Sequence, residues 1–259
     1  MAAMHSFHPC DAGRALASPH SSSWPCAPPT MPSLQLVIGN KNYSSWSMRP
    51  WVLLQHFGIP FEERMVRFDG FTPDSAFKRR MAEISPTGKV PALIDEGLTV
   101  WDTLAIAEYL AERHPEHPLW PRDRLQRARA RSLCAEMHSG FGALRSHLPQ
   151  NIEASLPEVG QRVLREQASV RADLDRLQAL WCEALAGSGG PFLFGEFGIV
   201  DAYFAPVVGR LRTYAVPVNA TVAAYMDRVW TSPGVAAWVA EALAEQEYLD
   251  FEEPYRQHR

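Results

Sequence analysis

The sequence has few cysteines and no long apolar run. Its four cysteines, at positions 10, 26, 134 and 182, form no C-x-x-C pair and no metal-ligand spacing, so we expect reduced thiols in a cytoplasmic protein and no bound metal. No stretch approaches the ~18 apolar residues of a membrane span. H-E-x-x-H, P-loop and G-x-S-x-G motifs are also missing. These absences exclude the zincins, the P-loop NTPases and the α/β-hydrolases.

The sequence also has little excess charge. It carries 25 Lys and Arg residues against 29 Asp and Glu residues, a formal net charge of −4, so neither nucleic acid nor an anionic membrane is indicated as a partner. A chain of 259 residues with 46% hydrophobic residues can bury one large core or two modest ones. Five arginines lie on the first helix predicted for the second half of the chain, and we interpret them as a solvated face or as ion pairs at a dimer interface: Arg122, Arg124, Arg127, Arg129 and Arg131.

The first thirty residues differ in composition from the rest. They are rich in Ala, Ser, Pro and His, with Arg14 as the only Lys or Arg and no continuous apolar segment. This composition argues against a secretory signal and gives little support to a transit peptide. We therefore expect residues 1–32 to be a disordered extension or a mis-annotated start, with Met31 as the alternative first residue.

Three serines stand where an apolar strand gives way to a helix. Residues 34–38 read as a short buried strand, a turn-forming loop follows, and helical spacing then continues to Gly58. Ser44, Ser45 and Ser47 thus lie near the first helical turn, where unpaired N–H groups and the helix dipole favour an anion or a thiolate. An ordinary N-cap serine is the alternative interpretation of this stretch.

Two later segments are suited to share that site. Residues 85–95 read as a loop and a short strand with Pro91 at its entry, and a proline there cannot donate to a sheet ladder. In the cis form Pro91 would turn the neighbouring backbone outward. Residues 101–110 begin a helix with Asp102 and Thr103, which offers a second positive helix end to a carboxylate.

In this order the three motifs resemble the cytosolic glutathione transferases. The Ser-Ser-x-Ser-x-Arg run at 44–49 resembles the zeta class and its bacterial relatives, and residues 88–93 resemble the family's cis-proline loop. Residues 102–110 resemble the acidic and hydroxyl pair that begins its third helix. The resemblance runs from about residue 34 to about residue 244. It implies a thioredoxin-like α/β domain followed by an all-α helical bundle.

The resemblance implies a role for the serines. Ser44 would hydrogen-bond the sulfur of glutathione and hold it as a thiolate, because a free thiol with a pKa of ~8.5 is mostly protonated at neutral pH. Ser45 and Ser47 could share this task, and the sequence does not decide among the three. Trp46, in the same run, is a candidate glutathione-binding residue and stands where the zeta class usually has a cysteine. Glutaredoxin-like redox chemistry therefore lacks its nucleophile, and zeta-type maleylacetoacetate isomerisation is not assigned.

The other two motifs would bind the rest of glutathione. Val90, exposed by Pro91, would pair its backbone N–H and C=O with the cysteinyl unit. Asp102 and Thr103 would hold the γ-glutamyl ammonium and carboxylate. Lys89 is a candidate cation beside the tripeptide, with an ordinary solvated lysine as the alternative.

The same reading predicts the domain organisation. Residues 33–113 form the thioredoxin-like domain, with elements in the order strand, helix, strand, helix, strand, strand, helix. Within it we expect a strand over 61–68, a helix over 73–81 and a hairpin at 93–100. A linker with three prolines at 114–121 leads to an all-α domain over 122–250 and a C-terminal tail over 251–259.

Helical periodicity in the second half predicts core stripes and one functional face. His138, Phe141 and Arg145 share a predicted face toward the cleft and would form the second-substrate pocket, with Arg145 holding an anionic electrophile. A core His138 and a surface Arg145 are the alternative. Further candidates for the rim are Arg210, Arg212 and Tyr214. Near Asp201, Gly198 takes the position where the family has Ser or Thr, so we expect an incomplete capping box.

The predicted function is that of a homodimeric, cytoplasmic glutathione transferase of the detoxification type, which activates glutathione for attack on a small electrophile. Glutathione is the co-substrate, and no metal is required. One alternative is a non-catalytic glutathione-binding or interaction module with the same fold. Another is a glutathione-dependent isomerase or peroxidase, which would use the same glutathione site.

Overall fold

The computed structural model describes residues 34–259, so the expectation for residues 1–32 lies outside the described range. The first half of this range has the predicted order of elements. These are β1 (Leu34–Ile38), α1 (Ser45–His56), β2 (Glu62–Met65), α2 (Ala76–Ala82), β3 (Ala92–Asp95), β4 (Leu98–Trp101) and α3 (Thr103–Arg113).

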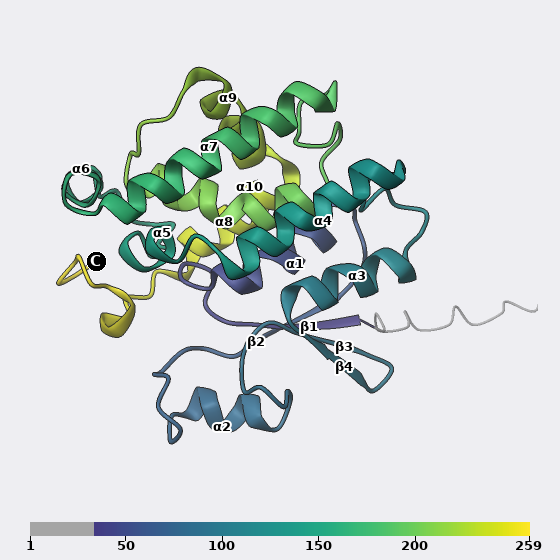
Figure 1. The fold of residues 1–259 in the computed structure, drawn as a ribbon. Coiled ribbons are helices and arrows are strands. Elements are labelled where there is room, and N and C mark those ends of the chain that lie inside the picture. Colours follow the sequence, from purple (N-terminus) through teal and green to yellow (C-terminus); the bar gives the residue numbers. More distant parts are fainter. Residues whose placement is uncertain (1–33) are drawn as a thin grey trace, which may run out of the picture. The chain divides into compact units, whose positions relative to one another are not determined.

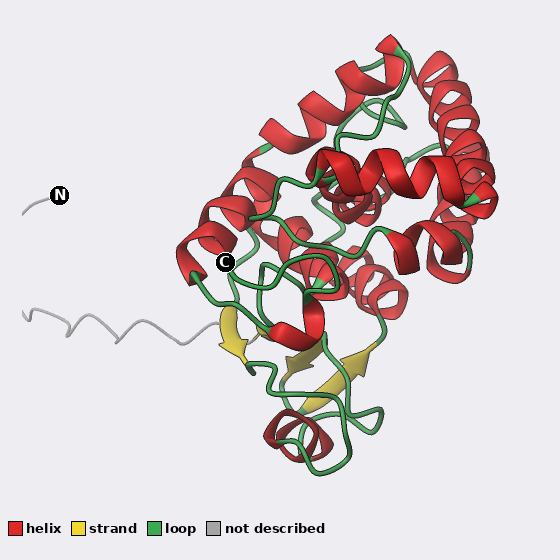
Figure 2. Cartoon of the chain, turned by 90° about the vertical axis from the view of Figure 1, so that its left-hand side faces the viewer, coloured by secondary structure: helices red, strands yellow, loops and turns green. Residues whose placement is uncertain are grey.

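The four strands form one sheet in the order β2-β1-β3-β4. β1 runs parallel to β2 and antiparallel to β3, which pairs antiparallel with β4. Because successive side chains of a strand point to opposite faces, Val37 packs with Phe77 and Met81 of α2, whereas Leu36 and Leu93 join the larger core with α1 and α3. Figures 1 and 2 show the sheet between α2 and the other helices.

Two elements are shorter than predicted, and polar side chains account for both. β2 occupies only the middle of the 61–68 segment, because the N–H of Phe68 donates to Asn40 Oδ1 at 2.8 Å and not to a neighbouring strand. α2 begins at Ala76, where Ser75 caps the helix and Asp69 accepts two N–H groups of its first turn. The preceding residues form turns that helical spacing does not reveal.

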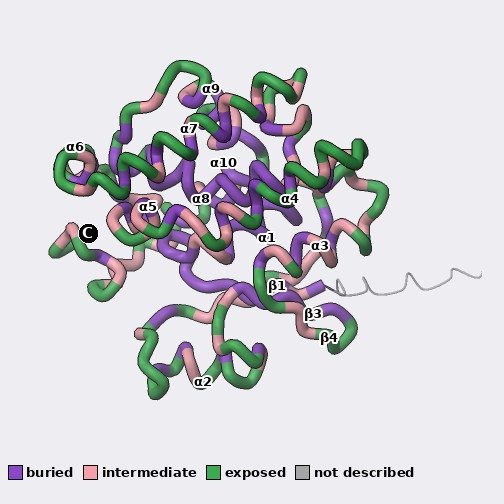
Figure 3. The backbone as a smooth tube through the Cα atoms, viewed as in Figure 1, coloured by how far each residue is buried: buried purple, intermediate pink, exposed green. Residues whose placement is uncertain are grey.

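The second half is helical. Its elements are α4 (Arg124–Ser139), α5 (Gly142–His147), α6 (Pro157–Glu166), α7 (Ala168–Ser188), α8 (Ile199–Thr213), α9 (Ala220–Thr231), α10 (Pro233–Glu245) and a short 3-10 turn, η1 (Asp250–Glu252). α8 is the central helix, and all of its residues except Arg212 are buried. Figure 3 shows α8, and the middle of α1, coloured mostly as buried.

The start of α8 depends on Asp201. Its carboxylate accepts the N–H of Gly198 at 3.0 Å and the N–H of Leu193 at 3.2 Å, and Tyr225 donates its hydroxyl at 3.0 Å. Gly198 has no side chain to return a bond, and a Cβ at this position would lie 3.0 Å from the carbonyl oxygen of Leu119. The close approach of that loop therefore explains a glycine where the capping box would need a hydroxyl.

The prediction that His138, Phe141 and Arg145 share one helical face is wrong. α4 ends at Ser139, the chain turns at Gly140, and Phe141 adopts a left-handed conformation (φ 53°) before α5 begins. His138 lies on α4 and Arg145 on α5, so the two do not share a helical face. Phe141 is buried in the core.

A buried lysine joins the two halves. The ammonium of Lys41, in the loop between β1 and α1, forms ion pairs with Glu63 at 2.7 Å and with Glu241 of α10, and it lies over the rings of Trp51 and Trp238. This cluster fixes the loop that leads to the serines against α10.

Candidate functional site

Two cavities share Trp46, Lys89 and Val90 in their linings. The larger has a volume of about 420 Å³ and the smaller about 270 Å³. The larger cavity is further lined by Tyr43, Ser44, Ser45, Phe68, Phe71, Phe77, Lys78, Arg145, Pro149, Gln150, Arg210 and Glu252. The smaller is further lined by Thr87, Pro91, Trp101, Asp102, Thr103 and His138.

The three serines occupy different environments. Ser47 is fully buried and lines neither cavity; its Oγ accepts the N–H of Gly39 at 3.2 Å and the hydroxyl of Ser44 at 2.7 Å. Ser44 is the N-cap residue of α1 and is 6% exposed. The Oγ of Ser45 accepts a hydrogen bond from Arg210 Nη2 at 3.2 Å. Ser44 and Ser45 therefore reach the larger cavity, whereas Ser47 supports the loop from behind.

Buried polar groups surround the larger cavity. Burial lowers the pKa of Arg210 to about 10, so its guanidinium stays charged at neutral pH. Glu252 is the only carboxyl group in the described lining; burial raises its pKa to about 7, and nearby Arg210 acts in the opposite direction. Gln150 is buried, and neither atom of its side-chain amide has a hydrogen-bond partner within residues 34–259.

The smaller cavity lies between the loop before β3 and the start of α3. The Val90–Pro91 peptide bond is cis. Asp102 has a left-handed backbone (φ 75°), caps α3 through the N–H of Leu104 at 2.9 Å, and places its other carboxylate oxygen 3.3 Å from His138 Nε2. A non-glycine residue at positive φ is uncommon, and such strain concentrates at functional sites.

Thr103 points away from the smaller cavity into the protein. Its hydroxyl lies 2.6 Å from the hydroxyl of Tyr203 and accepts a hydrogen bond from Arg49 Nη1 at 3.4 Å. The side chain is buried, so the group that Thr103 presents at the helix start is its backbone N–H. His138 lines this smaller cavity and not the larger one.

Trp46 lines both cavities and is in contact with cationic or titratable side chains. The guanidinium of Arg49 lies 4.1 Å from its ring centroid, and that of Arg145 lies 5.6 Å away. The ring of His138 meets it edge-on at 5.1 Å. These contacts hold the indole where it lines both cavities.

The three remaining rim candidates lie in different environments. Arg210 lines the larger cavity, whereas Arg212 is exposed and pairs with Asp227 at 2.8 Å. Tyr214 is buried behind the cavity and donates its hydroxyl to the carbonyl of Pro149 at 3.1 Å. Two of the five clustered arginines form ion pairs with other helices of the same chain: Arg131 with Glu108 and Arg129 with Glu183.

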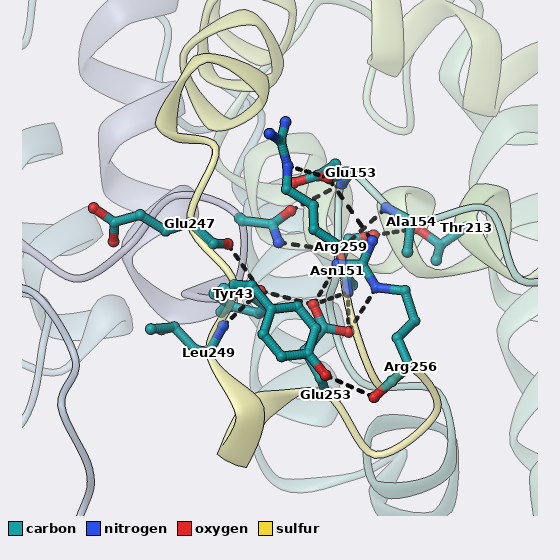
Figure 4. A network of polar contacts seen from close by, with 12 residues as sticks. Tyr43, Asn151, Glu153, Ala154, Thr213, Glu247, Leu249, Glu253, Arg256 and Arg259 are labelled. Carbon is teal, nitrogen blue, oxygen red and sulfur yellow. Dashed lines mark hydrogen bonds and ion pairs between the residues drawn. The ribbon is translucent and has the colours of Figure 1, made fainter.

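The end of the chain completes the larger cavity. We call residues 246–259 the C-terminal strap. The buried carboxylate of Glu253 accepts hydrogen bonds from the Tyr43 hydroxyl at 2.7 Å, from Asn151 Nδ2 at 2.8 Å and from Arg256 Nε at 2.9 Å (Figure 4). Burial raises the pKa of Glu253, but these hydrogen bonds outweigh it and leave the pKa below its usual value. Because Tyr43 directly precedes Ser44, the strap holds the residues on which the serines depend.

Within residues 34–259, no helix is long and apolar enough to cross a membrane, and no group of three or more His, Cys, Asp or Glu side chains is arranged to hold a metal ion.

The model of the glutathione S-transferase N-terminal domain matches residues 43–113, and the model of the C-terminal domain matches residues 123–241. This chain belongs to the glutathione S-transferase family. A solved glutathione transferase homolog from Burkholderia gl BGR1, with bound glutathione, has a TM-score of 0.61 and 27% identity over 81% of this chain and 97% of that one. The predicted glutathione S-transferase fold is thus confirmed.

Curated relatives of this chain within the family carry different names. A stringent starvation protein A homolog of Haemophilus influenzae is 27% identical over 195 residues, which cover 74% of this chain and 84% of that protein. A maleylacetoacetate isomerase of Rattus norvegicus is 29% identical over 181 residues, which cover 68% of this chain and 78% of the isomerase. Membership of the family therefore does not by itself select one activity.

Sequence reasoning missed several residues of this candidate site. Gln150 and Glu252 carry no local signal, because a polar residue after a proline and an acidic Asp-Phe-Glu-Glu run are typical of exposed loops. Tyr203 lies on α8, and only the fold brings its hydroxyl to Thr103 and to within 3.5 Å of His138 Nδ1.

Proposed function

We propose that the protein binds glutathione across the two cavities and delivers its thiolate to a small electrophile. The observation that supports this most is the shared lining of the two cavities by Trp46, Lys89 and Val90. A single extended ligand can therefore have one end beside Asp102 and its middle beside the serines.

The smaller cavity suits the γ-glutamyl end. The carboxylate of Asp102 would hold the ammonium group, and the first N–H groups of α3, including that of Thr103, would hold the carboxylate. The N–H and C=O of Val90 have no hydrogen-bond partner within residues 34–259 and would pair with the cysteinyl unit. Lys89 is exposed beside both cavities and would add a positive charge near the tripeptide.

The larger cavity suits the sulfur and the second substrate. At the start of α1 a serine hydroxyl and the helix dipole would favour the thiolate over the thiol. The thiol proton would pass to water, and the sulfur would then attack an electrophile held next to it. Arg145 and Arg210, which line the same cavity as three phenylalanines, favour an electrophile with an apolar body and a negative charge. His138 and Phe141 have no place in this second-substrate pocket.

The proposal includes a homodimer in the cytoplasm. Large apolar side chains are exposed on β4 and on α4: Leu98 is 54% exposed, Trp101 44% and Leu125 71%. Such side chains are typical of a surface that a second copy covers. Light scattering coupled to size-exclusion chromatography measures the mass of the particle, and a monomer at micromolar concentration would contradict this part.

Calorimetry of glutathione binding, combined with thiolate absorbance at about 240 nm against pH, tests the central proposal. We expect binding with the pKa of the bound thiol below its value in free glutathione, and turnover with an aryl halide such as chlorodinitrobenzene. Binding without that shift would favour a non-catalytic glutathione-binding module, which the similarity to the stringent starvation protein A homolog makes the second candidate. Absence of binding would contradict both. A bound thiolate that turns over only isomerisable or peroxide substrates would indicate the isomerase or peroxidase alternative.

A further inference from the structure

Arg210 is the only buried cation in the described lining of the larger cavity, and it forms no ion pair within residues 34–259. Its side chain belongs to the central helix α8 and is 6% exposed. Nη1 donates to the carbonyl oxygens of Leu148 at 2.6 Å and of Arg145 at 3.3 Å, and Nη2 donates to Ser45 Oγ at 3.2 Å. The guanidinium is therefore fixed by the main chain and has a single side-chain partner.

The two serines that reach the cavity differ in what their hydroxyl groups do. Ser44 donates its proton inward to Ser47. Ser45 instead accepts a hydrogen bond from a charged donor, and a serine oxygen that accepts a bond still has its own O–H to donate. Of the two, Ser45 has the proton that is free to point into the cavity.

We propose that Ser45 donates the hydrogen bond that holds the sulfur of glutathione as a thiolate, and that Arg210 is the positioning residue that orients and polarises the Ser45 hydroxyl. This assignment rests on the proposed function, because it concerns the same site. A hydrogen bond from an ionised donor is roughly twice as strong as a neutral one. An oxygen that accepts such a bond becomes a better donor in turn, since hydrogen bonds in a chain polarise one another.

The proposed step is a simple ionisation. The S–H bond of glutathione breaks and its proton passes to water, while Ser45 keeps its own proton throughout. The electron pair left on sulfur then forms the new bond to the electrophile. No group is oxidised or reduced.

The charges around Arg210 favour an anion at this position. The titratable groups that face it are Arg49 of α1, Arg145 of α5, Tyr214 at the end of α8 and Glu252 of the C-terminal strap. Three guanidinium groups thus share the region with one carboxyl group, so the local charge is positive whether or not Glu252 is ionised. A sulfur atom placed there gains from losing its proton.

The test measures thiolate absorbance of bound glutathione against pH in matched variants. Arg210→Met removes the charge and keeps most of the side-chain volume. Its control is Arg212→Met, on the same helix but exposed and paired with Asp227. We expect the thiolate fraction at neutral pH to fall roughly tenfold in Arg210→Met, to be unchanged in Arg212→Met, and to recover in part in Arg210→Lys.

Two serine variants test the role that the proposal assigns to Ser45. Ser45→Ala is expected to reproduce the loss of thiolate, and Ser44→Ala to keep most of it. The opposite ranking would overturn the role of Ser45, and an Arg210→Met variant that matches Arg212→Met would overturn the role of Arg210. If Arg210→Met does not fold, Ser45→Ala still decides, because it leaves Arg210 in place. A parent protein that binds no glutathione, or binds it without a thiolate, would instead contradict the proposed function.

Discussion

The smaller and the larger cavity differ in how the chain builds them. The smaller cavity is made mainly by segments close in sequence, the loop before β3 and the start of α3, and its main side chains, Asp102 and Lys89, are exposed. The larger cavity brings together residues from Tyr43 to Glu252, and several of its polar groups are buried. Substitutions in the smaller cavity should therefore alter ligand binding alone. Substitutions in the larger cavity should alter ligand binding and the stability of the fold together.

The largest effect is expected from Glu253, which fastens the C-terminal strap. Glu253→Ala removes the buried carboxylate that the Tyr43 hydroxyl, Asn151 and Arg256 share, so we expect the unfolding free energy to fall by about 3 kcal/mol. Urea unfolding measures this loss. We also expect KM for the electrophile to rise more than the Kd for glutathione, because the strap lines only the larger cavity.

The control for Glu253 is a carboxylate at the surface. Glu83 pairs with Arg80, and both side chains are more than half exposed, so Glu83→Gln should change the unfolding free energy by less than about 0.5 kcal/mol. Equal losses of unfolding free energy in the two variants would show that Glu253 contributes no more to stability than an exposed carboxylate does.

An intermediate effect is expected at the smaller cavity. Asp102→Asn keeps a helix-capping side chain but removes the charge that would hold the γ-glutamyl ammonium, so glutathione affinity should fall about tenfold by calorimetry. Thermal stability should change little. Asp123→Asn provides the control, since Asp123 caps α4 in the same way and lies outside both cavities. If both variants bind like the parent, the γ-glutamyl end is not held by Asp102.

The smallest effect concerns pH and Glu252. Its pKa is raised to about 7 from 4.5, so the folded state holds this proton more tightly than the unfolded state. The contribution of protonated Glu252 to the unfolding free energy is fully present below about pH 4.5 and is lost as pH rises through about 7. Glu252→Gln, which cannot ionise, should therefore gain stability over the parent by about 1 kcal/mol between pH 5 and pH 8.

Urea unfolding at both pH values tests this sign, with Asp250→Asn on the same short turn as the exposed control. A difference that stays constant with pH would show that Glu252 titrates as an ordinary surface carboxyl.

The same contrast explains how much of the site could be predicted from the sequence. The strand, helix and loop order of the first half, and the positions of Asp102 and Val90 in it, follow from local signals such as turn residues, a helix cap and a proline at a strand entry. Family resemblance then gave these motifs their expected roles. Those roles remain predictions.

The larger cavity could not be predicted in the same way. Arg210 and Glu252 come to the serines only through packing of α8 and the strap, and no periodicity links positions so far apart. The prediction that His138, Phe141 and Arg145 share one helical face was wrong for a related reason. Apolar spacing continues across the break at Gly140, because residues on both sides are buried, so hydrophobic periodicity alone does not show where α4 ends.

The hydrogen bond between Tyr43 and Glu253 also affects the order in which the protein can mature. A ribosome makes the serine loop long before the strap, and the domains of a growing chain fold as they emerge. The loop beside Ser44 therefore waits for its partner until Glu253, 210 residues after Tyr43, has been made and has left the exit tunnel. A nascent chain shorter than this can form the thioredoxin-like sheet but not the complete larger cavity.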